Sequence, residues 1–154
     1  GFVLFETGAI LRYVDEAYEG PSLQPAGARD RAVMNQILSI LDCYAYRTCV
    51  WEIYVERVAK TRDGSSADEV RISSALGEAR TVVSTLESLM GPGPFMLGTG
   101  PSLADCHAAP MLDLFAQAEE GAMLLKGAPG LSNWLENMHA RQSFQRTTPH
   151  RNPA

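Results

Sequence analysis

Three features are scarce in this sequence: long apolar runs, basic residues, and cysteines at paired spacing. The 154 residues include 13 Lys plus Arg against 18 Asp plus Glu, which gives a formal net charge of -5. Nucleic acids and anionic membranes repel a negative surface, so we expect neither as a partner. No apolar stretch approaches the roughly 20 residues that a membrane-spanning helix needs. No basic segment is followed by an apolar stretch, the pattern typical of a signal peptide.

The sequence also offers little for binding a metal. Its three cysteines, Cys43, Cys49 and Cys106, are odd in number and show no CxxC spacing, which is typical of reduced thiols in a cytoplasmic protein. His107 and His139 have no partners at metal-ligand spacing. We therefore predict no metal site, core or surface roles for both histidines, and a space-filling role for Cys106 in a buried helix.

The first 28 residues divide into an apolar run, an amphipathic segment and a linker. Residues 2–5, Phe-Val-Leu-Phe, are strand formers. Apolar positions then recur at helical spacing to about residue 19. Thr7 suits the N-cap of this helix, because its hydroxyl can accept a hydrogen bond from an orphaned backbone N–H. The stretch 20–28 holds two prolines and two glycines and is predicted to be a linker.

Helical periodicity dominates the chain from residue 29 to residue 141. The apolar steps alternate between four and three residues over 29–62, and the same rhythm predicts helices over 68–90, 103–115 and 129–141. The face expected to point inward on the long helix is made of Val33, Ile37, Ile40, Tyr44, Arg47, Trp51, Tyr54 and Val58. Residues 142–154 form the C-terminal tail, and its polar end, TTPHRNPA (147–154), is expected to fray.

One strand and at least four helices do not make a complete domain, because a lone strand leaves both of its edges unpaired. The segment FVLFETGAILRYVDE (2–16) resembles the last strand and third helix of the thioredoxin-like domain of cytosolic glutathione S-transferases. The segment GPFMLGTGPSLADCHAAPML (93–112) is similar to part of that family's all-helical C-terminal domain. The resemblance covers essentially the whole chain and keeps the family's order of elements.

The resemblance implies a mainly α fold, the C-terminal helical bundle of this family preceded by a strand and helix remnant of an α/β domain. The end of the thioredoxin-like domain would occupy residues 1–19, the linker 20–28, the all-α domain 29–141 and the tail 142–154. The implied protein is a cytoplasmic homodimer that conjugates the thiolate of glutathione to electrophilic small molecules. The alternative is a non-catalytic module of the same fold that serves in binding or assembly.

The resemblance also assigns residues. The γ-glutamyl group of glutathione would bind at Glu6 and Thr7, where a helix N-terminus offers free N–H groups to a carboxylate. The residue that activates the thiol lies, in the family, in the first strand-helix turn of the thioredoxin-like domain. No residue of this chain is assigned that task, so the catalytic group is unknown.

Further candidates lie on the predicted long helix over 29–62 and at the start of the predicted helix over 103–115. Tyr46, Arg47 and Trp51 are candidates for the wall of the electrophile pocket, with packing of the aromatics and a solvent-reaching arginine head as the alternative. Ser102 and Asp105 have the spacing of a capping box, with Asp in place of the usual Glu or Gln. We predict that this pair is structural, and that replacing either residue costs about 1 kcal/mol of stability.

Overall fold

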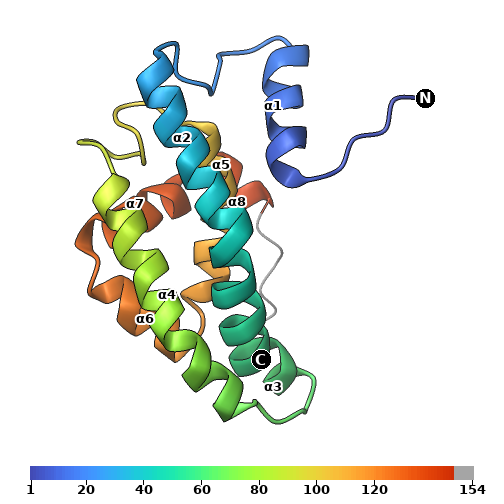
Figure 1. Cartoon of the computed structure of the whole chain (residues 1–154), viewed down its shortest axis with the longest axis vertical. Coiled ribbons are helices and arrows are strands. Elements are labelled where there is room, and N and C mark those ends of the chain that lie inside the picture. The colour runs from blue at the N-terminus through green and yellow to red at the C-terminus, as the bar shows by residue number, and fades with distance from the viewer. Residues whose placement is uncertain (148–154) are drawn as a thin grey trace.

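The computed structural model describes residues 1–147 and shows a helical bundle (Figure 1). Three segments join end to end into one long rod: α2 (Ala28–Ile40), η1 (Leu41–Ala59) and α3 (Lys60–Arg62). α4 (Glu69–Leu89) runs back along this rod, and α5 (Leu103–Phe115) packs against α2 and η1. The predicted long helix over 29–62 and the helices near 68–90, 103–115 and 129–141 are confirmed.

Three shorter helices, α6 to α8, complete the bundle. α6 (Glu119–Lys126) and α7 (Pro129–Ala140) follow α5, and α8 (Gln142–Thr147) packs on α7. The sequence interpretation left α6 out, although its two acidic residues at the start and a lysine before Gly127 are helix start and stop signals. α8 lies within the predicted tail 142–154 and ends at Thr147, and residues 148–154, on which the expected fraying falls, lie outside the described residues.

The predicted strand over residues 2–5 is wrong. Within residues 1–147 no strand forms, and the one isolated bridge joins Phe95 to Gly98. A strand requires a neighbouring backbone to accept and donate its hydrogen bonds, and no described segment runs beside residues 2–5. Phe2, Val3 and Phe5 are consequently 74%, 79% and 74% exposed.

The long rod buries a different face from the one predicted. Its middle segment, η1, is a π-helix in which the N–H at its end, that of Lys60, bonds to the carbonyl five residues earlier. The inward positions of η1 recur every four residues, at Leu41, Ala45, Cys49 and Ile53. Of the predicted line, only Ile37 is fully buried, and the aromatic side chains of Tyr44 and Trp51 are exposed.

α1 (Thr7–Ala17) stands apart from this core. Figure 1 shows α1 and the residues before it projecting from one side of the bundle, with the start of α1 nearest to η1. Leu11 is the one residue of α1 that packs against the main core. The first turn of α1 is thus open on one side and close to the bundle on the other.

Candidate functional site

The start of α1 has an uncommon backbone geometry. Glu6 precedes the helix with φ 72° and ψ 118°, and is the one non-glycine residue with positive φ among residues 1–147. Such a conformation costs on the order of 1–3 kcal/mol, and it concentrates at functional sites. The helix begins at Thr7, so Glu6 and not Thr7 holds the N-cap position, and neither side chain caps the helix.

This turn leaves backbone donors available. The N–H groups of Ala9 and Ile10 both bond to the carbonyl of Glu6, at 3.0 Å each. The N–H groups of Thr7 and Gly8 donate to no residue that the structure describes. Glu6 and Thr7 are both exposed. A carboxylate placed here would meet two amide donors, one hydroxyl and the positive end of a helix dipole.

Polar residues support the same turn from behind, among them the buried His107 of α5 and the exposed Asp42 of η1. Gly8 is buried, and a Cβ at this position would lie 3.2 Å from both Arg12 Nη1 and Asp42 Oδ2. Arg12 donates to the Gly8 carbonyl at 2.7 Å and to Asn35 Oδ1 on α2 at 2.5 Å. His107 Nε2 lies 2.6 Å from Asp42 Oδ1. The close contacts explain why the position carries a glycine.

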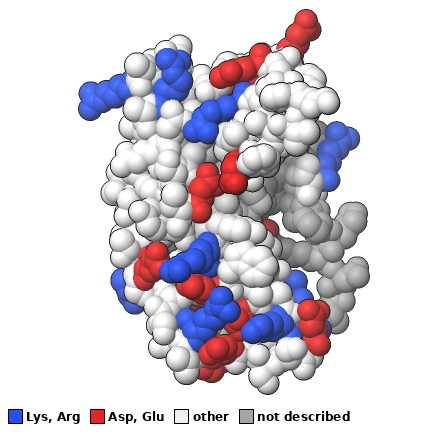
Figure 2. Space-filling view, turned by 45° about the vertical axis from the view of Figure 1, so that its right-hand side comes forward, with Lys and Arg blue, Asp and Glu red and all other residues white. Residues whose placement is uncertain are grey.

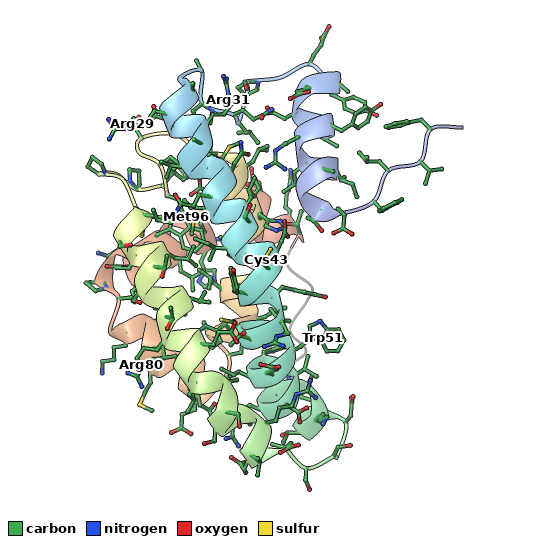
Figure 3. The ribbon with its side chains drawn as sticks, viewed as in Figure 1. Arg29, Arg31, Cys43, Trp51, Arg80 and Met96 are labelled. Carbon is green, nitrogen blue, oxygen red and sulfur yellow. The ribbon has the colours of Figure 1, made fainter. Side chains whose placement is uncertain are left out.

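The aromatic candidates lie on η1 at an exposed surface. Tyr46 and Trp51 are 45% and 49% exposed, and their rings meet edge to face with centroids 6.3 Å apart. In Figure 3, Cys43 and Trp51 lie on the side of the bundle from which α1 projects. Arg47 is engaged elsewhere, because its guanidinium lies 3.7 Å from Glu52 and 3.3 Å from Glu78 of α4.

These features can be compared with known proteins. The family model described as the glutathione S-transferase C-terminal domain matches residues 28–137. The chain belongs to this family. Glutathione S-transferase F14 of Arabidopsis thaliana is 26% identical over 97% of this chain and 60% of its own length. Glutathione S-transferase L2, chloroplastic, of the same plant is 27% identical over 94% of this chain and 45% of its own length.

This chain thus spans 60% and 45% of the length of these two relatives. Among solved structures, glutathione S-transferase III in apo form has a TM-score of 0.83 at 24% identity, covering 98% of this chain and 71% of that chain. A family member from Pseudomonas fluorescens with two glutathione bound has a TM-score of 0.75 at 21% identity, over 93% of this chain and 62% of that one. These superpositions show the shared helical fold.

A cavity of about 660 Å³ in this transferase-family bundle lies away from the aromatic candidates. The cavity wall includes Leu23 of the linker, Cys106 and Pro110 of α5, Arg141 just before α8, and Phe144 of α8. Tyr46, Arg47 and Trp51 do not contribute to it. The structure therefore brings none of the three electrophile-pocket candidates into this cavity.

The thiols differ from one another in exposure. Cys106 is exposed at the cavity wall, so its prediction as a buried filler is wrong. Desolvation, assisted by Asp105, raises the pKa of Cys106, and burial raises the pKa of Cys49 to about 12. Both therefore remain protonated thiols at neutral pH and are poor nucleophiles. Cys43 is exposed and Cys49 buried, in agreement with their expected location on different faces.

His107, His139 and Arg57 have partners that sequence spacing did not reveal. His107 is buried against Asp42, and His139 lies 2.8 Å from Asp113. Arg57 bridges Glu69 and Glu120, so the basic end of the long rod is neutralised. Figure 2 shows Lys and Arg interspersed with Asp and Glu at this lower end of the molecule.

Two further kinds of site, metal-binding clusters and membrane-spanning helices, are absent from the part of the chain that the structure describes. Residues 1–147 contain no group of three or more His, Cys, Asp or Glu side chains arranged to hold a metal ion. No helix in this range combines the length and apolar character needed to cross a bilayer.

Proposed function

We propose that this chain provides the helical domain and the glutathione-binding helix of a transferase that conjugates the thiolate of glutathione to electrophilic small molecules. The observation that carries the proposal is the strained, uncapped start of α1 at Glu6, in a chain that belongs to the glutathione S-transferase C-terminal domain family. The Thr7 and Gly8 amides, which donate to no described residue, fit a γ-glutamyl carboxylate. Two solved relatives, one with two glutathione bound and one with lactoylglutathione, support this ligand class.

Each residue at the turn has a distinct task in this proposal. The Thr7 hydroxyl and the two free amides bind the γ-glutamyl carboxylate, and the Glu6 carboxylate faces the α-ammonium group. The thiolate is the nucleophile that attacks the electrophile. We assign no residue of this chain to thiol activation, and propose that the thioredoxin-like domain of the family supplies it.

The aromatic pair on η1 is the proposed wall of the electrophile site. Trp51 lies on the side of the bundle from which α1 projects, and the ring of Tyr46 meets it edge to face. Aromatic side chains are common in pockets for small apolar molecules. Arg47 is left out because Glu52 and Glu78 already surround its guanidinium. We further propose a cytoplasmic homodimer, a state that sedimentation equilibrium and cell fractionation would test.

Calorimetric titration with glutathione tests the proposed site. Thr7→Val and Glu6→Gln should each weaken binding on the order of tenfold, because each removes a charge-assisted hydrogen bond. Thr99→Val and Glu19→Gln are matched controls, because both residues are exposed and make no described side-chain contact. Wild-type protein that gives no heat at millimolar glutathione would overturn the proposal.

Conjugation of glutathione to a nitroaryl halide, followed by absorbance, separates the enzyme from a binding module. Conjugation above the uncatalysed rate supports the transferase. Glutathione binding without conjugation of any electrophile supports the non-catalytic alternative, a module for binding or assembly.

A further inference from the structure

A buried histidine and a carboxylate connect α5 to η1 directly behind the first turn of α1. His107 is 2% exposed, and its Nε2 lies 2.6 Å from Asp42 Oδ1. An ionised carboxylate only accepts hydrogen bonds, so the imidazole N–H donates. The second oxygen of Asp42 lies against Gly8, 3.2 Å from where a Cβ would stand.

Apolar packing contributes little to the position of α1. Leu11 alone among its residues packs against the main core, whereas Ile10, Tyr13 and Val14 are 40%, 43% and 48% exposed. α1 also lies against α5. The polar contacts that join α1 to α2 and η1 are the hydrogen bonds from Arg12 to Asn35 and the contact between Gly8 and Asp42.

We propose that His107 and Asp42 are positioning residues that set the location of the glutathione-binding turn, an inference that rests on the proposed function. His107 fixes the Asp42 carboxylate, and the carboxylate sets how closely Gly8 approaches η1. The Gly8 N–H is one of the two free amides, so a shift of the turn moves a ligand donor. Misplacement of a binding group by about 1 Å weakens an interaction that depends on geometry.

The first experiment compares His107→Ala with His107→Gln. Alanine removes the donor to Asp42, and glutamine keeps an N–H near the place of Nε2. His107→Ala should weaken glutathione binding on the order of tenfold, and His107→Gln should restore it to within about twofold of wild type. His139→Ala is the matched control, because it removes a similar histidine-aspartate pair between α5 and α7 at 2.8 Å. This control should leave glutathione affinity unchanged.

The second experiment does not require glutathione. Amide hydrogen exchange at Ala9, Ile10 and Leu11 should accelerate about tenfold in His107→Ala relative to exchange in α4, because the turn loses its support. Gly8→Ala should have the same effect by displacing Asp42, and it replaces His107→Ala if that variant fails to fold. Equal exchange in α1 of wild type and both variants overturns the positioning role.

The two experiments distinguish the two proposals. Wild-type protein that does not bind glutathione overturns the proposed function, while the exchange rates still decide whether His107 positions α1. Wild-type binding together with an unchanged affinity of His107→Ala overturns the positioning role alone. An affinity that falls equally in His107→Ala, His107→Gln and His139→Ala indicates a general loss of structure and also overturns it.

Discussion

Asp105 is the most connected buried carboxylate of the bundle, and its replacement by asparagine gives a sharp test of the structure. The side chain is fully buried. Its Oδ1 accepts hydrogen bonds from Met96 N at 2.8 Å and Trp134 Nε1 at 2.7 Å. Its Oδ2 accepts from Ser102 N at 2.8 Å and Ser102 Oγ at 2.7 Å. The carboxylate therefore ties the loop before α5, the start of α5 and α7 together.

Asp105→Asn keeps the shape of the side chain and removes one acceptor. With its oxygen in the place of Oδ1, the amide keeps the bonds to Met96 and Trp134. Its NH₂ group then faces the Ser102 N–H, which is left buried without an acceptor. A lost bond to a charged group plus a buried unsatisfied donor costs about 3 kcal/mol in total. This exceeds the roughly 1 kcal/mol expected from a capping residue alone.

The assay is thermal unfolding followed by circular dichroism. A loss of about 3 kcal/mol corresponds to a decrease in Tm of roughly 6–12 °C for a chain of this size. Asp63→Asn is the control, since Asp63 is exposed in a turn and its side chain makes no described contact. An Asp105→Asn protein that melts like wild type would refute the role of this carboxylate in joining the three segments. One that melts normally but loses glutathione binding would show that Asp105 belongs to the ligand site instead.

Three further changes test the buried polar groups. Thr48→Val should raise the free energy of unfolding by about 1 kcal/mol in urea titration, because its buried hydroxyl has no partner among the described residues; a destabilised variant would contradict this. The hydrogen bond from Lys60 lowers the pKa of Glu56 from 4.5, so stability present above pH 4.5 should be lost as the pH falls through the lower folded value. Glu56→Gln should reduce this loss of stability at acid pH. An unchanged loss in the variant would assign the pH dependence to other carboxylates. Glu87→Gln should cost about 1–2 kcal/mol, because Glu87 accepts from the first amides of α7 at 2.8 Å each; exposed Glu136→Gln is its control and should be neutral.

The helices could be predicted from sequence because their signal is local. Apolar residues at steps of three and four located the long rod, α4, α5 and α7, and α4 begins after Asp68, which caps Arg71 N at 3.0 Å as its residue type suggests. The capping box of Ser102 and Asp105 is likewise a four-residue pattern, and the structure contains it. Residues three or four positions apart lie close together in any helix, so such patterns can be recognised from the sequence alone.

The features that sequence did not predict depend on distant residues. His107 and Asp42 are 65 positions apart, and Trp134 and Asp105 are 29 apart, so no spacing rule connects them. The buried face of η1 was missed because a π-helix advances its inward positions by four, and residue types alone favoured the aromatics. The strand over residues 2–5 was predicted from residue type, but strand formation depends on a partner strand.

The strained backbone at Glu6 requires that the bundle support the first turn of α1. A positive φ at a non-glycine residue costs on the order of 1–3 kcal/mol, and an unsupported turn would relax. Each net hydrogen bond contributes about 0.5–1.5 kcal/mol, so one contact is too weak to hold the turn. The two bonds from Arg12 to Asn35 and the fixed Asp42 carboxylate tie α1 to the bundle and together reach the required magnitude, while the bond from Arg12 to the Gly8 carbonyl lies within α1. The open amides at the start of α1 are therefore maintained by α2, η1 and α5, and the proposed glutathione site is a property of the whole bundle.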